Sequence, residues 1–204
     1  MSSMDTGTGQ PRALIVVDVQ PTFCEGGALP VEGGNDVAQD VADFVRYRQD
    51  EYALVVTTQD WHIDPGPHFA TPPEEPDFVD TWPPHGIAGT VEAALHPALD
   101  GIEFDASVKK GEFQAAYSGF EGADAAGKPL EEILAAAGVS AVDIVGLAES
   151  HCVKDTAIDA TQLGLDTRVL RDLTAPVSEE LGVAAREAMR EAGVTFLDSA
   201  DVDL

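Results

Sequence analysis

The chain has 204 residues, which is long enough for one α/β domain with a full hydrophobic core and short for two. Its formal charge of -26, from 37 acidic and 11 basic residues, argues against nucleic acid as a partner, because no basic patch outweighs the repulsion of phosphates. The longest apolar runs, such as 13–17, are far too short to cross a bilayer, so we also expect no membrane partner.

The amino end, residues 1–11, is polar and rich in Gly, Ser and Thr, and it has neither the basic start nor the apolar stretch of a secretory signal. We expect a flexible N-terminal tail on a cytoplasmic protein. The two cysteines, Cys24 and Cys152, are too few for a disulfide framework and agree with a reducing compartment. The strong negative charge suggests a host with a high-salt cytoplasm, and an ordinary acidic enzyme is the alternative. Thermal unfolding that is insensitive to potassium chloride would count against the high-salt hypothesis.

Apolar, β-branched runs alternate with segments of helical spacing, and this alternation is typical of a parallel sheet wrapped by crossover helices. The predicted strands cover 12–17, 53–57, 104–108, 142–147, 167–170 and 194–197. The predicted helices cover 36–50, 130–137, 153–163 and 179–192. We therefore predict a single α/β domain over 12–204, with a doubly wound, mainly parallel six-stranded sheet and helices on both faces.

Several residues mark the ends of these helices. Asn35 is the expected cap of the first helix, and Ser178 is the expected cap of the last. Glycines suited to a positive φ stand where helices should end, at Gly138, Gly164 and Gly193.

The segment from about 60 to 101 has a different character, because its prolines rule out a long helix or a central strand. These are Pro65, Pro67, Pro72, Pro73, Pro76, Pro83, Pro84 and Pro97. Long irregular loops inside a compact domain are often functional, so we expect this loop to form a wall or lid of a site.

In open parallel sheets, ligands gather outside the carboxyl ends of the strands. The first four predicted strands are each followed by reactive side chains: Asp18, then Asp60 and His62, then Lys109 and Lys110, then His151 and Cys152. A carboxylate, an ammonium and a thiol converging on one edge indicate a nucleophilic site.

Cys152 comes directly before a predicted helix, whose positive end favours a thiolate and whose free N–H groups suit an oxyanion. An arbitrary cysteine is more often buried and inert, but the strand-to-helix turn beside His151 favours a nucleophile here. Cys24 lacks such a helix start, so we interpret it as structural.

Asp18 ends an apolar strand, where poor solvation raises the pKa of a carboxyl group into a range useful for proton transfer. The alternative is that the Asp18 carboxylate caps the following turn. Alternation along a strand lets only one of Lys109 and Lys110 face the site.

A second cluster lies in the proline-rich loop. Four of the five histidines fall between Asp60 and His96, and Asp60, His62, His68 and His85 form a His3Asp set with open positions for a divalent ion. Scattered loop histidines are the less favoured alternative. His96 precedes Pro97, so we expect it to open a turn and not to bind the ion.

These residues match a known family over nearly the whole chain, from 12 to about 197. The chain resembles the isochorismatase-like cysteine hydrolases, and within them the nicotinamidases, also called pyrazinamidases. The resemblance rests on the segments at 15–20, 23–27, 60–66, 82–86, 110–111, 116–122 and 151–153.

The resemblance implies a fold, a reaction and a set of site residues. It implies Asp18 as general base and acid, Lys110 as its partner in preference to Lys109, and Cys152 as nucleophile. It further implies metal ligation by Asp60, His62, His68 and His85, substrate contacts from Phe23, Trp82, Tyr117 and His151, oxyanion N–H groups from Ala148 and Cys152, and a cis Leu147–Ala148 bond. The implied metal is one divalent ion, with zinc expected and iron and manganese also compatible with the ligands.

The expected activity is hydrolysis of nicotinamide, and of pyrazinamide as well, through a thioester on Cys152. Another small-amide or carbamoyl hydrolase of the superfamily is the alternative enzyme, and a non-catalytic metal-binding module is the alternative outside enzymes. Two segments depart from the family pattern: Pro21-Thr22 stands in place of Asn-Asp, and Ser150 in place of an acid. We expect these departures to bear on pocket shape and rate and not on the type of reaction. The sequence does not decide between a monomer and a homo-oligomer.

Overall fold

The apolar run predicted at 12–17 forms a strand at the centre of a six-stranded sheet in the computed structural model, which describes residues 10–204. The predicted tail at 1–11 therefore lies almost entirely outside the described residues, and the division into tail and domain stays a prediction. The strands are β1 (Arg12–Val17), β2 (Leu54–Asp60), β3 (Ala106–Lys110), β4 (Ala141–Leu147), β5 (Asp166–Ala175) and β6 (Thr195–Leu197). They lie in the order β3-β2-β1-β4-β5-β6, and every neighbouring pair is parallel.

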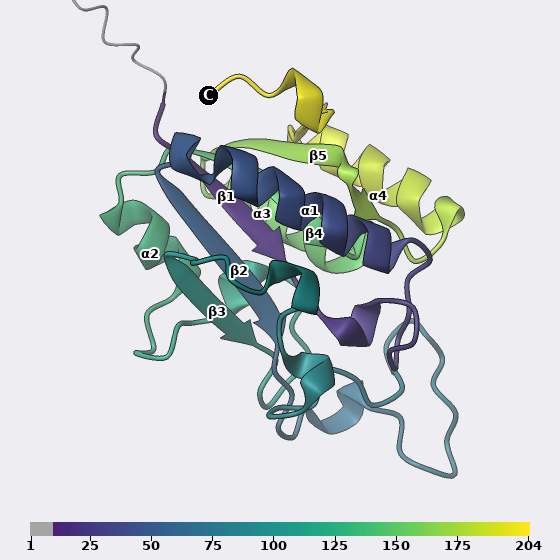
Figure 1. Ribbon diagram of the computed structural model, residues 1–204. Helices are drawn as coiled ribbons and strands as arrows, with labels where there is room; N and C mark the ends of the chain where they lie inside the picture. Colours follow the sequence, from purple (N-terminus) through teal and green to yellow (C-terminus); the bar gives the residue numbers. More distant parts are fainter. Residues whose placement is uncertain (1–9) are drawn as a thin grey trace, which may run out of the picture.

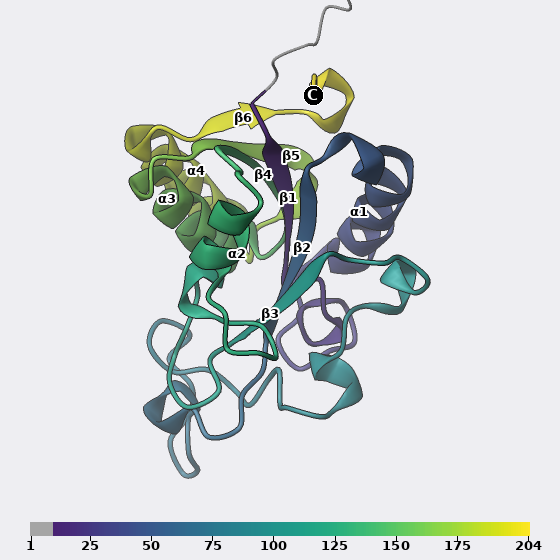
Figure 2. The ribbon, with the colours of Figure 1, turned by 90° about the vertical axis from the view of Figure 1, so that its left-hand side faces the viewer.

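The helices cover both faces of this sheet, which confirms the predicted doubly wound α/β class. They are α1 (Gly34–Arg48), α2 (Leu130–Ala136), α3 (Lys154–Gln162) and α4 (Glu179–Ala192). Figure 2 shows α1 on one side of the sheet and the other three helices on the opposite side.

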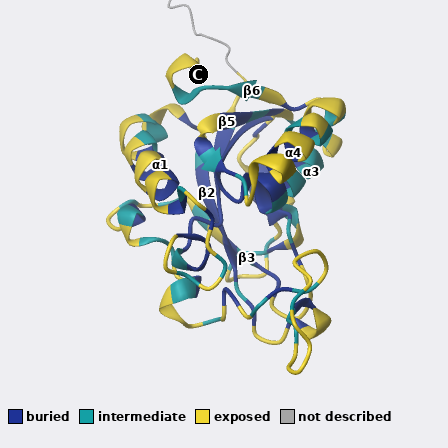
Figure 3. Ribbon diagram, turned by 90° about the vertical axis from the view of Figure 1, so that its right-hand side faces the viewer, coloured by how far each residue is buried: buried dark blue, intermediate teal, exposed yellow. Residues whose placement is uncertain are grey.

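The alternating side chains of β1 contribute to two separate cores. Leu14 and Val16 pack in the core on the α1 side, whereas Ala13, Ile15 and Val17 pack in the core that includes α2, α3 and α4. All five are fully buried. Figure 3 shows that most of the sheet between the helices is buried in the same way. Burying a side chain of the size of Leu14 or Ile15 stabilises the fold by about 1.5–3 kcal/mol, so this strand anchors the sheet.

The predicted helix ends were right at the last helix and wrong at the first. Ser178 caps α4 by accepting a hydrogen bond from the N–H of Leu181, and Gly193 ends it with φ of 99°. Asn35 lies inside α1 and does not cap it. The Glu25 carboxylate caps α1 from the preceding loop, accepting from the N–H groups of Gly33 (2.6 Å) and Asn35 (2.9 Å).

Figure 1 shows the long loops gathered beyond the carboxyl ends of β1, β2 and β3. The segment between β2 and β3 contains only short 3-10 turns, at Gly66–His68, Val91–Ala93 and Pro97–Leu99, as the prolines predicted. Isolated β-bridges join His62 to Ile87 and Phe69 to Trp82, so distant parts of the loop are hydrogen-bonded to each other. No helix among residues 10–204 is long and apolar enough to cross a membrane.

Candidate active site

Asp18 follows β1 directly and is completely buried. Its backbone is left-handed, with φ of 46°, which is unusual outside glycine. The Thr58 hydroxyl donates to Oδ1 at 2.6 Å, and Lys110 Nζ forms an ion pair with Oδ2 at 2.9 Å. Burial raises the pKa of the Asp18 carboxyl, with the Lys110 ammonium acting in the opposite direction. The predicted pKa rise is therefore confirmed in direction.

The structure resolves the choice between the two lysines in favour of Lys110. Both belong to β3, so their side chains point to opposite faces of the strand. Lys110 is 1% exposed and faces Asp18, whereas the Lys109 ammonium lies 3.4 Å from the centre of the Trp61 ring.

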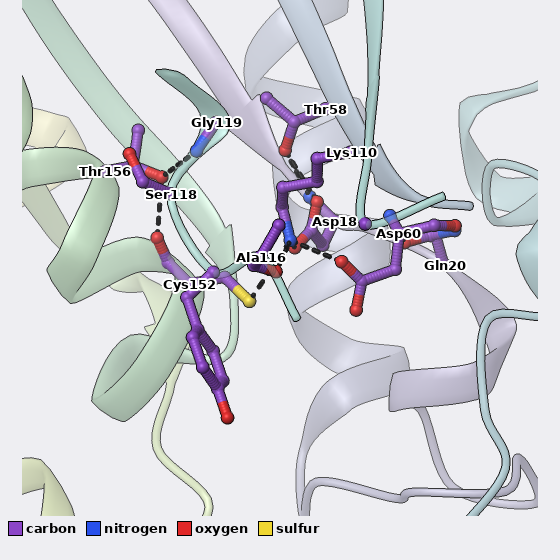
Figure 4. Close-up of polar contacts among 12 residues, drawn as sticks. Asp18, Gln20, Thr58, Asp60, Lys110, Ala116, Ser118, Gly119, Cys152 and Thr156 are labelled. Atoms are coloured by element: carbon purple, nitrogen blue, oxygen red, sulfur yellow. Dashed lines mark hydrogen bonds and ion pairs between the residues drawn. The ribbon is translucent and has the colours of Figure 1, made fainter. Parts of the chain in front are cut away.

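The Lys110 ammonium connects the predicted catalytic residues with the predicted metal ligands, which the sequence analysis treated as separate groups. It contacts Asp60 as well as Asp18, donates to the Ala116 carbonyl at 3.2 Å and lies 3.5 Å from Cys152 Sγ (Figure 4). Burial alone would lower the pKa of Lys110, but the two carboxylates raise it well above its usual value. Lys110 is therefore a permanent cation at the centre of the site.

Cys152 lies in a π-helical turn, Glu149–Val153, that runs directly into α3. The helix predicted over 153–163 is therefore confirmed, with its α-helical part beginning at Lys154 and Cys152 in the turn before it. A thiolate was expected at Cys152, but the groups around the sulfur favour the protonated thiol. Burial first, and then the charges of Asp18 and Asp60, raise the pKa of the Cys152 thiol well above its usual value, although Lys110 lowers it. The thiol therefore needs a base, and an Asp18 oxygen lies within 4.8 Å of the sulfur.

The turn around Cys152 is held by hydrogen bonds on both sides. The Ala148 carbonyl accepts from the N–H groups of His151 (3.0 Å) and Val153 (3.2 Å), and the Leu147–Ala148 bond is cis, as the resemblance implied. The Thr156 hydroxyl donates to the Cys152 carbonyl at 2.6 Å (Figure 4). Ala148 and Cys152 thus lie at one hydrogen-bonded turn.

The four predicted metal ligands come together from the end of β2 and the loop after it. Donor nitrogens of His62, His68 and His85 lie within 4.8 Å of one another, and Asp60 Oδ2 lies 3.5 Å from His62 Nε2 and 3.6 Å from His85 Nε2. All four side chains are buried.

Two observations show that this group fits a divalent metal ion. His62 Nε2 and His68 Nδ1 are buried without a hydrogen-bond partner among the described residues, which is costly unless a ligand satisfies them. Three imidazoles and one carboxylate are also a donor set that such ions accept.

The protonation of the group suits a cation as well. Burial and the neighbouring His85 and His62 lower the pKa of His68 to about 4. Although burial acts to raise the pKa of Asp60, Lys110 and the histidines hold it well below its usual value. At neutral pH the site therefore offers a neutral His68 and an ionised Asp60.

Outer contacts fix the orientation of these ligands. His62 Nδ1 lies 2.6 Å from the Gly111 carbonyl, and His85 Nδ1 lies 2.8 Å from that of Pro83. The Gln20 side chain donates to the Asp60 carbonyl at 3.0 Å and accepts from the Asp60 N–H at 2.9 Å. Such second contacts orient metal ligands and tune their affinity.

Cys152 and three of the predicted metal ligands face the same pocket. It is lined by Cys152, Ala148, Asp60, His68 and His85 together with the four predicted substrate-contact residues, Phe23, Trp82, Tyr117 and His151. The Trp82 indole N–H donates to the Tyr117 hydroxyl at 2.9 Å, and the Trp82 and His151 rings meet edge to face with centroids 5.3 Å apart.

Sequence reasoning missed several residues of the pocket and its supports. Leu29, Val31, Ala116 and Val177 line the pocket as well, and Thr58 and Gln20 hold Asp18 and Asp60. The apolar residues have no chemical signal of their own. Gln20 does stand two residues after Asp18 at a strand end, and this position was a signal for its role.

Cys24 and His96 lie outside the site. Cys24 packs in the α1-side core, where burial and the Glu25 charge raise its pKa to about 11. His96 caps a 3-10 turn by accepting from the Ala98 N–H, as a turn-opening residue should. The departure at Thr22 keeps a polar function: its hydroxyl donates to Glu92 (3.1 Å) and accepts from the Gly86 N–H (3.1 Å), beside His85.

Comparison with known proteins agrees with this geometry. Residues 12–201 match the family model described as the isochorismatase domain. The chain belongs to the isochorismatase family. It is 50% identical over 188 residues to the nicotinamidase/pyrazinamidase of Mycobacterium tuberculosis, covering 92% of this chain and 99% of that protein.

Two solved structures are also similar to this chain. A Pyrococcus horikoshii pyrazinamidase in complex with zinc has a TM-score of 0.78 and 34% identity, with 92% of this chain and 99% of that chain covered. PnC1 from L. infantum in complex with nicotinate has a TM-score of 0.80 and 32% identity, with 94% of each chain covered.

Proposed function

We propose that this protein is a nicotinamidase that hydrolyses nicotinamide to nicotinic acid and ammonia, and that it accepts pyrazinamide as well. The observation that carries the proposal is that Cys152 lines the same pocket as Asp60, His68 and His85. A proposed nucleophile and three proposed metal ligands thus face one pocket, as hydrolysis of a small metal-bound substrate requires. The similarity to nicotinamidases and pyrazinamidases supports the same substrate class.

The reaction starts from a protonated thiol. Asp18 takes the proton of Cys152, and its raised pKa suits a group that must accept a proton and return it. The Lys110 ammonium is close to both, at 2.9 Å from Asp18 and 3.5 Å from the sulfur, so it offsets negative charge wherever the proton resides.

The Cys152 thiolate then attacks the amide carbon, and the N–H groups of Ala148 and Cys152 stabilise the oxyanion that develops. Asp18 returns the proton to the leaving nitrogen, the carbon–nitrogen bond breaks, and ammonia departs from a thioester. Water attacks the thioester with Asp18 again as base, which releases nicotinic acid and regenerates the Cys152 thiol.

Substrate position follows from the pocket walls. Phe23, Trp82, Tyr117 and His151 provide aromatic surfaces for a flat ring, and packing of this kind holds the amide near the sulfur. Asp60, His62, His68 and His85 would hold the divalent ion, which supplies a Lewis-acid contact for the ring nitrogen when bound. Zinc is the ion we propose, and a cytoplasmic location remains a prediction.

Ammonia release from nicotinamide, pyrazinamide and benzamide tests this proposal. Benzamide has the same ring shape without a ring nitrogen, so we expect turnover of the first two and little of the third. Equal turnover of benzamide and of small carbamoyl compounds would favour a general amide hydrolase, and no turnover of any would favour a binding module.

The nucleophile assignment has its own test. Cys152→Ala should abolish ammonia release while zinc content by elemental analysis is unchanged, and Cys24→Ala is the matched control that should retain turnover. Full activity of Cys152→Ala would refute the thioester mechanism.

A further inference from the structure

The hydroxyl of Ser150 lies between a pocket side chain and a pocket backbone segment. Its Oγ is 2.9 Å from His151 Nδ1 and accepts a hydrogen bond from the Val177 N–H at 3.1 Å. Ser150 belongs to the π-helical turn that carries Cys152, whereas Val177 belongs to the segment between β5 and α4. His151 and Val177 both line the pocket, so one buried hydroxyl joins two of its walls.

The two contacts determine where the hydroxyl hydrogen goes. Since the Val177 N–H is a donor, Ser150 Oγ acts as acceptor toward it. Among residues 10–204, the other partner of this oxygen is His151 Nδ1. A buried hydroxyl hydrogen without an acceptor is costly, so the Ser150 O–H donates to Nδ1, which must then be the unprotonated ring nitrogen.

The surroundings of His151 agree with a neutral ring. Burial and the charge of Lys154 lower the pKa of His151, so at neutral pH the imidazole carries one proton. With Nδ1 accepting from Ser150, that proton is on Nε2. No residue in the described range 10–204 accepts a hydrogen bond from Nε2, so this N–H is available to a pocket ligand.

We propose that Ser150 is a positioning residue of this pocket: it fixes His151 as the Nε2–H tautomer and anchors the Val177 wall to the turn of the nucleophile. The inference deepens the proposed function, on which its kinetic part rests. His151 then presents a donor suited to an acceptor oxygen, such as the carbonyl of an amide substrate or the carboxylate of its acid product.

The choice of serine at position 150 affects which nitrogen of His151 carries the proton. An acid, which is common here in the resembled family, would favour the Nδ1–H tautomer instead. An ionised carboxylate only accepts hydrogen bonds, so Ser150→Asp would still accept from the Val177 N–H but would draw the ring proton to Nδ1. Ser150→Thr keeps both functions of the hydroxyl, and Ser150→Ala loses both. These three variants therefore separate the effect on the tautomer from the effect on the loop.

The test is nitrogen NMR of the zinc-loaded full chain labelled with 15N-histidine, with the His151 signals assigned by comparison with His151→Gln. We expect Nε2 protonated and Nδ1 unprotonated in the wild type and in Ser150→Thr, both tautomers in Ser150→Ala, and a protonated Nδ1 in Ser150→Asp. Nicotinamide KM should rise about five-fold in Ser150→Ala, the equivalent of about 1 kcal/mol for one hydrogen bond, with a smaller effect on kcat.

A matched control is Ser199→Ala, which removes a hydroxyl that donates to Asp172, away from the pocket, and should leave both KM and the His151 signals unchanged. A wild-type ring protonated on Nδ1, or a Ser150→Ala variant with unchanged tautomer and KM, would overturn the proposal. If the wild type hydrolysed no amide, the proposed function would fail, while the NMR signals would still decide the role of Ser150.

Discussion

Lys110 Nζ and the Asp18 carboxylate form an ion pair of 2.9 Å in which neither side chain is accessible to solvent. The same ammonium contacts Asp60, one of the residues grouped around the expected metal ion. The side chain proposed to move protons and the side chain proposed to bind metal therefore share one cation.

In the metal-free protein, replacing that cation leaves Asp18 and Asp60 buried without the ammonium that pairs with both. We expect Lys110→Met to lower the free energy of unfolding by about 3–5 kcal/mol and to reduce kcat/KM by roughly a hundred-fold or more. Urea unfolding and ammonia release measure the two effects. Lys109→Met, on the opposite face of the strand, is the control, and an equal loss there would contradict the role assigned to Lys110.

The Asp18 charge raises the pKa of the Cys152 thiol, so removing it should have two opposite effects. In Asp18→Asn the thiol pKa falls, and alkylation of Cys152 by iodoacetamide should extend to lower pH than in the wild type. Turnover should nevertheless fall by roughly 10²–10⁴-fold because the base is lost. Mass spectrometry separates Cys152 from Cys24, and an Asp18→Asn variant that kept its turnover would remove Asp18 from the mechanism.

Gly111 supports a metal ligand through its lack of a side chain. Its φ is 75°, and a Cβ at this position would lie 2.6 Å from Cε1 of the His62 ring. Gly111→Ala should therefore weaken zinc affinity about 10- to 100-fold, in addition to the backbone cost of about 1–2 kcal/mol.

The control variant Gly127→Ala separates the collision with His62 from the backbone strain of a positive φ. Gly127 has φ of 81° and no atom within 4 Å of the added Cβ, so the variant has the backbone strain without the collision. We expect it to lose stability but to bind zinc as the wild type does. Competition with a chromogenic chelator gives both affinities, and equal affinities for the two variants would show that His62 adapts to the collision.

Arg186 pairs with one buried and one exposed acid, so we expect removal of the two acidic charges to lower the free energy of unfolding by different amounts. Glu149, in the turn of Cys152, lies 2.8 Å from Arg186 and its side chain is 5% exposed, whereas Glu179 lies 2.5 Å away and is 76% exposed. Glu149→Gln should cost roughly 3 kcal/mol of unfolding free energy and Glu179→Gln under about 1 kcal/mol. Chemical denaturation of both variants checks the difference, and equal losses would show that burial is irrelevant to this pair.

The low pKa of His68 predicts acid lability of the metal-free protein. Its folded value of about 4 lies below the usual 6.5, so between these values the unfolded chain binds a proton that the folded chain does not. This contribution to stability is complete above pH 6.5 and is lost as the pH falls toward 4. His68→Gln should flatten that part of the stability profile in urea unfolding, and an unchanged slope would contradict the buried neutral histidine.

The order of strands and helices and the chemistry at the strand ends followed from the sequence. Strand runs such as 12–17 and 142–147 are apolar at every or nearly every position, which is typical of a sheet buried on both faces. Asp18, Asp60, Lys110 and Cys152 follow or end such runs, so the topology of a parallel sheet was enough to place them at one edge. The local cap at Ser178 was equally readable, because it depends on residues only three positions apart.

The tertiary structure alone decided how these side chains act on one another. The sequence gives no sign that Lys110 contacts both Asp18 and Asp60, that the Cys152 thiol has a raised rather than a lowered pKa, or that Ser150 joins His151 to Val177. A pKa and a hydrogen bond depend on burial and on neighbours from distant segments, and their strength changes within an ångström or two. Residue types and spacing determined which groups reach this edge of the sheet, and only their packing determined their charges.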